Sequence, residues 1–338
     1  PKNDIFKLRA DDMRDMGFWE RRGKESGRKQ ASYLNQRLAG LVKTTGSMFY
    51  RSNAASGYDF ISEAQALKNE RQQAKGERVF ILNDRDTQKF GKDLAARQTL
   101  QGRPDETWRT GQIGANVAEF DLFTGSYLGT LLGGASPGTT VSATQSFKPV
   151  GQALSGGILL NVDYRLATVP VVASAAYNIG DKVTFTNVNA IALTDKTDTG
   201  SLMTFTIVGK PTGTSVEIYP KPIAFNDGSL SVEEKAYANV NTQIVSGAVM
   251  ARLNIDASAK TNIFFDKDSI EIIGGDAPLQ LLSEYSGSKV VSSQMKSGQT
   301  MYMVYDGDVR TLNFTCRLFT WWGLNNRNPS ANGVAVTF

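Results

Sequence analysis

The sequence contains no histidine among its 338 residues. Serine and cysteine nucleophiles are usually activated by a histidine base, so Ser-His-Asp and Cys-His catalytic sites are excluded. Zinc sites that depend on histidine or on paired cysteines are excluded as well. Enzymes that use carboxylates, lysine or backbone donors remain open. The absence still lowers the expectation of catalysis, and the sequence predicts no catalytic residue and no cofactor.

Cysteine is almost as scarce, because Cys316 is the only one in the chain. A lone cysteine cannot form an intramolecular disulfide, which fits synthesis in a reducing cytoplasm. Cys316 lies in the apolar, strand-like run LNFTCRLFTWW. A cysteine in such a run is usually a small buried hydrophobe rather than a reactive thiol, so we expect it to be buried.

Long apolar runs are also missing. No window reaches the roughly 18 apolar residues of a transmembrane helix, and the charged N-terminal stretch PKNDIFKLRADD predicts no signal peptide. Because residue 1 is proline rather than methionine, we expect the chain to be processed, excised or only partly represented. Apolar residues nevertheless make up 41% of the sequence, enough for two or three domains with a sizeable core.

Charge is spread unevenly along the chain. Residues 1–100 contain 20 Lys and Arg against 13 Asp and Glu, a net charge of +7, whereas the whole chain carries +4, so the remainder carries −3. A basic N-terminal third could face a polyanion. A solvated helix surface with mixed charges explains the excess equally well.

Residues 8–46 predict a long helix. Four apolar residues recur at the spacing of one helix face: Leu34, Leu38, Leu41 and Val42. Gly46 provides a C-terminal stop. Three glycines weaken the upstream part by roughly 1 kcal/mol each, and we expect a bend or an unwound turn near them: Gly17, Gly23 and Gly27.

Shorter elements follow this helix. Residues 59–75 predict a second helix, which ends before Gly76. The run ERVFILN predicts a buried strand, after which Asn83 or Asp84 would cap a third helix, DTQKFGKDLAAR. The glycine-rich residues 129–140 have the composition of a loop or linker.

From residue 142 to about residue 223 the chain changes character. Short alternating runs between turn signals predict a small antiparallel β-barrel or sandwich: ILLNVDYRLATVPVVA, DKVTFTNV, SLMTFTIVG and TSVEIYP. A capping box at Ser231–Glu234 predicts a helix start and the end of this β-region. Long apolar strands beyond residue 251 are expected to pair with one another beside the first helix: TNIFFDKDSIEIIGG, QTMYMVYDG, DVRTLNFTCRLFTWWGLN and GVAVTF. The sequence therefore predicts an α+β fold in which a β-domain interrupts a host domain.

The stretch LRADDMRD concentrates five charged residues: Arg9, Asp11, Asp12, Arg14 and Asp15. Paired carboxylates can bind Mg²⁺ or transfer protons, but no third ligand and no phosphate-binding loop accompany them. The same residues suit the first turn of a helix and ion pairs within or between subunits. We favour ion pairs and predict no metal site.

Two further clusters are candidate contact surfaces. In FTWWGLNNRNP, Trp321 and Trp322 precede Arg327, a combination that can stack on sugars or bases. Neighbouring residues of a strand face opposite sides, so packing in a core or between subunits is favoured. The basic run RRGKESGRK could contact nucleic-acid phosphate without reading the base sequence: Arg21, Arg22, Lys24, Arg28 and Lys29.

Several long segments follow one another in a fixed order: FKLRADDMRD, TQSFKPV, NVDYRLATV, GDKVTF, YPKPIA with LSVEEKAYANVNT, TNIFFDKDSIEII, and DVRTLNFTCRLFTWWGLNNRNPSANGVAV. In this order they resemble the spine-helix start, the start of the inserted domain, two of its strands, its exit and the return to the capsid core in one family. That family is the major capsid (coat) protein of P-twenty-two-like tailed double-stranded DNA bacteriophages. The resemblance covers nearly the whole chain and is weaker over residues 48–140.

The resemblance implies a Hong Kong 97 type capsid fold with an inserted antiparallel β-barrel domain. The implied division is a spine helix of the peripheral domain at 1–47, an axial domain at 48–142, the inserted β-barrel at 143–248 and the peripheral return strands at 249–338. It places the departure from the barrel at Ser231.

The implied function is self-assembly into hexamers and pentamers of an icosahedral phage head, which encloses double-stranded DNA and expands as the DNA is packaged. The protein would be made in the host cytoplasm and reside in the virion. Its implied partners are copies of itself, a scaffolding protein, a portal and non-specifically contacted DNA, with a decoration protein as a further option and no membrane. Subunit contacts would involve Arg9, Asp11, Asp12, Arg14, Asp15, Asp163, Trp322 and Arg327. Packaged DNA would face Arg21, Arg22, Lys24, Arg28 and Lys29.

The sequence departs from the family in two places. The family begins upstream with an N-terminal arm and an extended loop, whereas here the spine-helix segment arrives almost at residue 1. An acidic loop that bridges capsomers in the family corresponds to QALSGGILLNVD, where Ser155, Gly156 and Gly157 replace the charges. Asp163 is the nearest carboxylate.

Two alternatives from other classes remain open. A β-rich surface module could recognise a carbohydrate or receptor, with Trp321 or Trp322 as a stacking platform. A carboxylate-dependent hydrolase could use Asp11, Asp12 or Asp15 with Mg²⁺.

Overall fold

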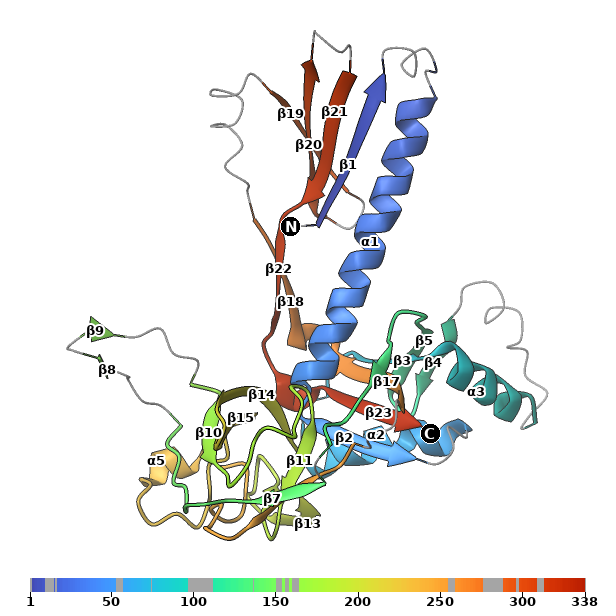
Figure 1. Cartoon of the computed structure of the whole chain (residues 1–338). Coiled ribbons are helices and arrows are strands. Elements are labelled where there is room, and N and C mark those ends of the chain that lie inside the picture. The colour runs from blue at the N-terminus through green and yellow to red at the C-terminus, as the bar shows by residue number, and fades with distance from the viewer. Residues whose placement is uncertain are drawn as a thin grey trace. The chain divides into compact units, whose positions relative to one another are not determined.

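The computed structural model in Figure 1 describes most of the chain. The described residues are 2–9, 15, 17–52, 57–73, 75–96, 112–135, 137–149, 154–155, 158–159, 164–254, 259–275, 288–295, 298–308 and 313–337. The chain divides into two compact units, a first unit of Pro1–Leu38 with Ile270–Asn325 and a second unit of Ala39–Ser269 with Asn326–Phe338. Over the described ranges, no helix combines the length and the apolar character that crossing a bilayer requires.

The first unit is built on a four-stranded antiparallel sheet with the strand order β1-β21-β20-β19. The strands are β1 (Lys2–Arg9), β21 (Asn313–Thr320), β20 (Thr300–Asp308) and β19 (Lys289–Gln294). The start of helix α1 (Phe18–Thr45) runs along β1 in Figure 1. Two shorter strands, β18 (Ile270–Gly274) and β22 (Trp322–Asn326), form a separate pair.

The long N-terminal helix begins later than the sequence predicts. Leu8 and Arg9, expected in the helix, are the end of β1 instead, because they pair with β21 from the far end of the chain. The expected turn is present at Gly17, just before the helix, but α1 continues without a break through Gly23 and Gly27. The predicted stop is confirmed: α1 ends at Thr45, and the Gly46 amide donates to the Val42 carbonyl at 2.8 Å.

The first half of α1 is buried along a narrow and partly polar stripe. Ser26, Gln30 and Leu34 are buried at intervals of four residues, which places them on one face of the helix. Gly23 and Gly27 flank the first of them. The glycines that weaken the helix in isolation therefore lie beside its buried face, where tertiary packing outweighs local propensity.

The second unit contains a seven-stranded mixed sheet. Its strand order is β2-β23-β17-β3-β5-β4, with β6 paired to β17, and the β2–β23 and β3–β5 pairs are parallel. The strands are β2 (Met48–Ser52), β23 (Gly333–Thr337), β17 (Ala259–Asp266), β3 (Arg78–Leu82), β5 (Phe120–Thr124), β4 (Gln112–Val117) and β6 (Thr130–Leu131). The accompanying helices are α2 (Gly57–Glu70) and α3 (Asp84–Ala96).

Two predictions in this region are confirmed and two need correction. The strand predicted from ERVFILN is β3, and the Asn83 side chain accepts hydrogen bonds from the Arg85 and Asp86 amides at 3.0 Å, which caps α3. α2 ends at Glu70 rather than near residue 75, because Gln72 adopts a left-handed conformation with φ of 51°. The predicted linker 129–140 also contains two short strands, β6 and β7 (Gly138–Thr140).

Aromatic side chains fill the core beneath the seven-stranded sheet. Phe80 lies at the centre of the group, with ring centroids 5.7 Å from Phe120, 5.8 Å from Phe264 and 5.9 Å from Phe60. Tyr50 packs against Phe60 at 5.3 Å, and its hydroxyl donates to the Phe60 carbonyl at 2.6 Å. The cluster joins β2, α2, β3, β5 and β17 into one body.

A second, antiparallel sheet of the second unit has the strand order β10-β15-β14-β11-β16-β7. Its remaining strands are β10 (Ala167–Pro170), β15 (Ser215–Tyr219), β14 (Phe205–Thr212), β11 (Lys182–Phe185) and β16 (Val249–Arg252). The two edges of this sheet meet at one bridge between Val141 and Val171, where the Val172 amide donates to the Thr140 carbonyl at 3.0 Å.

Short elements complete the second unit. Two small strand pairs are β12 (Asn189–Ile191) with β13 (Asp198–Leu202), and β8 (Leu154–Ser155) with β9 (Ile158–Leu159). Two short 3₁₀ turns are η2 (Lys267–Ser269) and η3 (Pro329–Ala331). The described residues thus form a mixed α+β fold that is rich in sheets and has few helices.

The predicted capping box is present, but it does not mark the end of the β-region. Ser231 and Glu234 exchange both hydrogen bonds of the box at the start of α5 (Val232–Lys235), a single turn. Beyond it, Val240 and Met250 return to the buried core of the six-stranded sheet, and β16 is one of its strands. The exit at Ser231 was therefore predicted too early, because a capping box reports a local helix start and not a domain boundary.

Candidate functional site

Most of the basic run on α1 is already paired within the chain. Three ion pairs lie on the helix surface: Arg21 with Asp15, Arg22 with Glu25 at 3.1 Å, and Lys24 with Glu20 at 2.6 Å. Hydrogen bonds from Arg21 and Lys24 lower the pKa of Asp15 and Glu20, respectively. Exposed pairs of this kind contribute little to stability, so they describe a mixed-charge surface.

Asp4 of β1 pairs with one further basic residue, Lys29, and also with Arg22. Its carboxylate is 5% exposed and lies 2.7 Å from the Lys29 ammonium and 3.8 Å from the Arg22 guanidinium. The hydrogen bond from Lys29 lowers the pKa of Asp4. The Arg22 guanidinium also lies over the Phe6 ring, 4.9 Å from its centroid. These contacts fasten α1 to the edge strand of its sheet.

Arg28 differs from its basic neighbours. Its side chain is exposed, and no ion pair with another described residue involves it. Of the five basic residues that could face DNA, Arg28 is therefore the one whose charge is left uncompensated by the described part of the chain.

The acidic stretch before α1 lies mostly outside the described residues. Asp11, Asp12 and Arg14 are not described, and Arg9 is described only as backbone in β1. Asp15 is engaged by Arg21 and by the Gly17 amide at 2.9 Å. Among the residues that the structure describes, no group of three or more acidic or cysteine side chains could hold a metal ion.

The two tryptophans have different surroundings, although Trp321 lies between β21 and β22 and only Trp322 is on a strand. Trp321 is 45% exposed. Trp322 packs on Tyr33 with a centroid distance of 5.9 Å, and its indole N–H donates to the Thr320 hydroxyl at 3.1 Å. Arg327 is exposed, and its amide donates to the Ser269 carbonyl at 2.7 Å. Trp322 thus packs and hydrogen-bonds within its own chain, whereas the side chains of Trp321 and Arg327 are exposed to solvent.

The proposed capsomer-bridging loop also falls mainly outside the described residues. Asp163 is not described, and only the short β8–β9 pair of that segment is. The correspondence of this segment to the bridging loop of the family therefore stays a prediction.

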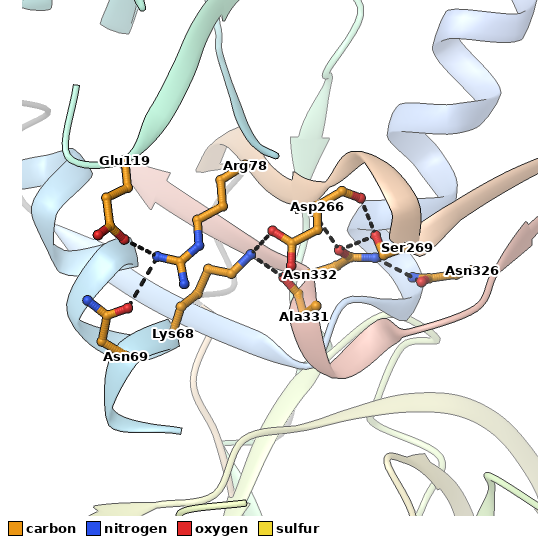
Figure 2. A network of polar contacts seen from close by, with 9 residues as sticks. All are labelled: Lys68, Asn69, Arg78, Glu119, Asp266, Ser269, Asn326, Ala331 and Asn332. Carbon is orange, nitrogen blue, oxygen red and sulfur yellow. Dashed lines mark hydrogen bonds and ion pairs between the residues drawn. The ribbon is translucent and has the colours of Figure 1, made fainter. Parts of the chain in front are cut away.

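Figure 2 shows a polar network inside the second unit that the sequence did not predict. At its centre Lys68 of α2 is fully buried, pairs with Asp266 of β17, and donates to the Ala331 carbonyl at 2.9 Å. Burial lowers the pKa of Lys68 to about 8, although the nearby Asp266 carboxylate opposes this shift. The pair joins α2, the end of β17 and the segment before β23.

The network continues on both sides of this pair. On one side, Arg78 of β3 donates to the Glu119 carboxylate at 2.7 Å and to the side-chain Oδ1 of Asn69 at 3.2 Å. On the other side, the Asn332 side chain accepts from the Ser269 hydroxyl at 2.7 Å and donates to the side-chain Oδ1 of Asn326 at 2.8 Å (Figure 2).

The arrangement in Figure 2 suits a structural role. Its central charges are buried and satisfied by one another, which leaves no accessible base or nucleophile at the centre of the network. Its members come from distant parts of the sequence, as Lys68 and Asp266 show, so local spacing could not reveal it. The local signal is that Lys68 follows Phe60, Ile61 and Ala64 at the spacing of one helix face, so a lysine occupies an otherwise apolar stripe.

The chain matches the family model described as "P22 coat protein - gene protein 5" over residues 1–337. The chain belongs to the P22 coat protein family. It is therefore a bacteriophage capsid protein by family, a structural class rather than an enzyme class.

Three solved structures are also similar to this coat protein. The CUS-3 coat protein I-domain is 28% identical over 36% of this chain and all of its own length, with a TM-score of 0.29. A Mycobacterium phage Che8 chain is 10% identical over 99% of this chain and 69% of its own, with a TM-score of 0.41. A chain from the head fiber and inner core protein gp22 structure of native bacteriophage P68 is 9% identical over 99% and 69%, with a TM-score of 0.35. At these TM-scores the three structures do not define the fold.

Proposed function

We propose that this coat protein is the major capsid protein of a tailed bacteriophage, and that it assembles into hexamers and pentamers of an icosahedral head around double-stranded DNA. The observation that carries the proposal is the family match over residues 1–337. A closed shell repeats every subunit contact many times, so each contact can be weak.

The proposal includes a Hong Kong 97 type fold with an inserted β-barrel. The six-stranded antiparallel sheet is the candidate barrel, and the bridge between Val141 and Val171, where its two edges meet, supports closure. We assign residues 1–47 to the spine, 48–142 to the axial domain, 143–248 to the insert and 249–338 to the peripheral return. The strands β7 and β16 lie just outside 143–248 on either side, so the candidate barrel extends a few residues beyond both bounds of the insert.

The proposed contacts follow from charge and exposure. Arg28 is the leading DNA-facing residue, because its neighbours Arg21, Arg22, Lys24 and Lys29 already pair with carboxylates. The subunit-contact candidates are Arg9, Asp11, Asp12, Arg14, Asp15, Asp163, Trp322 and Arg327. A scaffolding protein, a portal and a decoration protein are the further proposed partners, and synthesis in the host cytoplasm would precede residence in the virion.

The test is negative-stain microscopy combined with sedimentation velocity, on the protein alone and co-expressed with its scaffolding partner. Closed shells of uniform size are expected in at least one of these preparations. A monodisperse monomer in both, with any natural N-terminal extension included, would contradict the proposal. An Arg28→Ala variant should assemble normally, which separates shell formation from DNA contact.

A further inference from the structure

Two adjacent residues of opposite charge are fully buried at the start of β11. Asp181 and Lys182 are each 0% exposed, yet they do not simply neutralise each other. Each makes its own hydrogen bonds to a different part of the second unit. Buried charges are costly unless they are satisfied, so the destinations of these bonds indicate what the pair does.

Lys182 reaches the C-terminal end of α1. Its ammonium donates to the Gly46 carbonyl at 2.6 Å and to the Thr206 hydroxyl at 2.8 Å, and that hydroxyl donates to the same carbonyl at 2.8 Å. The last carbonyls of a helix have no partner within the helix and carry its negative dipole end. A cation and a hydroxyl from β11 and β14 therefore supply what the helix end lacks.

The surroundings of Gly46 leave no room for a side chain at this position. A Cβ there would lie 2.8 Å from the Val42 carbonyl oxygen and 3.1 Å from the Asn332 backbone. The chain is held this closely where its carbonyl turns toward Lys182, so the end of α1 has a defined position in the second unit.

Asp181 binds the chain segment that precedes β7 and the segment that follows β16. Its carboxylate accepts from the Gly134 amide at 3.1 Å, just before β7, and from the Asn254 side chain at 2.9 Å, just after β16. The side-chain Oδ1 of Asn254 in turn accepts from the Lys182 amide at 2.9 Å. The segments that lead into and out of the sheet thus meet at one carboxylate.

We propose that Lys182 and Thr206 form the C-terminal cap of α1, and that Asp181 locks this cap to the segments leading into and out of the six-stranded sheet. The sheet and the end of α1 then move as one body. A displacement of either is passed to the other through the Gly46 carbonyl. The proposal concerns the isolated chain and does not depend on shell assembly.

The test is hydrogen exchange of the unassembled full chain, followed at the amides of residues 42–46. Lys182→Met keeps the length of the side chain and removes the ammonium, and Thr206→Val keeps its volume and removes the hydroxyl. Loss of a hydrogen bond to a charged group predicts exchange about tenfold faster or more at the end of α1 in both variants. The β10–β15 amides should stay protected, because their ladder is not altered.

Two control variants make the test specific. Lys210→Met removes a lysine of β14 whose ammonium also donates to a backbone carbonyl, that of Tyr177 at 2.7 Å, away from α1. It should leave residues 42–46 unchanged, as should Thr206→Ser, which retains the hydroxyl. Unchanged exchange at 42–46 in both Lys182→Met and Thr206→Val would overturn the proposal. So would a uniform loss of protection across the second unit in Thr206→Val, because a cap acts locally.

Discussion

The two units of this coat protein are each stabilised by a different kind of internal contact. The second unit buries a continuous aromatic cluster and a large apolar core within its six-stranded sheet. Among its described residues, the first unit has a small apolar cluster of Tyr302 and Phe319, with Val304 packed against it, and charged contacts that join β1 to α1. Apolar contacts are not screened by salt, whereas ion pairs that reach the surface are weakened by it. The two units should therefore respond differently to the same perturbation.

The largest difference is expected from removing an aromatic ring in each unit. Phe264→Ala in the second unit should lower the free energy of unfolding by about 3–5 kcal/mol, because the ring packs on Phe80, Phe120 and Tyr50. Phe319→Ala should cost less, toward the lower end of the same range, because its described buried cluster is smaller. Urea unfolding followed by domain-specific hydrogen exchange measures both values. Equal costs would remove the contrast between the units.

Removing one carboxylate from each unit should give the next largest difference. Asp266→Ala leaves Lys68 fully buried without its partner and should cost about 3 kcal/mol or more. Asp4→Ala should cost only about 1 kcal/mol, because the Lys29 side chain is 55% exposed and can turn to water.

A double variant sharpens this prediction. Lys68→Met combined with Asp266→Leu removes both buried charges and should recover much of the stability lost in Asp266→Ala. A double variant as unstable as the single one would show that the pair itself, and not the orphaned charge, accounts for the loss.

The stability of the second unit should change with pH in the alkaline range, and that of the first unit in the acid range. Burial lowers the pKa of Lys182 to about 7 and that of Lys68 to about 8, from an ordinary 10.5. At a pH between the lowered and the ordinary pKa, the unfolded chain binds more protons than the folded chain. The free energy of unfolding of the second unit should therefore rise from about pH 7 toward pH 10. In the first unit the pKa of Asp4 is lowered from 3.8, so its contribution is present above that pH and is lost as the pH falls below it.

Urea midpoints measured across this range check the pH prediction. Lys182→Met should flatten the alkaline rise, and Asp4→Asn should flatten the acid loss. A wild-type stability that falls between pH 7 and pH 9 would contradict the assignment of buried, readily deprotonated lysines to the second unit.

The smallest expected effect concerns DNA. Arg28→Ala should lower non-specific binding to duplex DNA and reduce the slope of log affinity against log salt by about 1, the value for one lost phosphate contact. Lys24→Ala should change the slope less, because Lys24 is paired with Glu20 at 2.6 Å. Fluorescence anisotropy over a salt series distinguishes the two. Equal slopes in both variants would mean that intrachain pairing does not select the DNA-facing charge.

The sequence predicted correctly several features that depend only on nearby residues. The Asn83 cap, the Ser231–Glu234 box, the stop at Gly46 and the strand β3 all depend on neighbours within a few residues, and all are present. Burial of Cys316 is confirmed for the same reason, since its apolar run is a strand. The family resemblance, which uses the whole chain, was confirmed as well.

The rest depends on pairings between distant segments. β1 was missed because its partner is β21, and the Lys68–Asp266 pair was missed because α2 and β17 are far apart in sequence. The roles of Asp181 and Lys182 were missed although GDKVTF was recognised as a strand, because a charged residue at a strand start usually faces solvent. Among the basic candidates on α1, the sequence could not predict the pairing of Lys29, since its partner Asp4 lies on a different element.

The position of β23 in the seven-stranded sheet has a consequence for biosynthesis. β23 lies between β2 and β17, yet the ribosome makes it after both of them. Until β23 emerges, each of these strands exposes an open edge, and open edges are templates for pairing with other chains. The interval between translation of residue 266 and residue 337 is therefore the period in which a nascent coat subunit most needs protection from its neighbours.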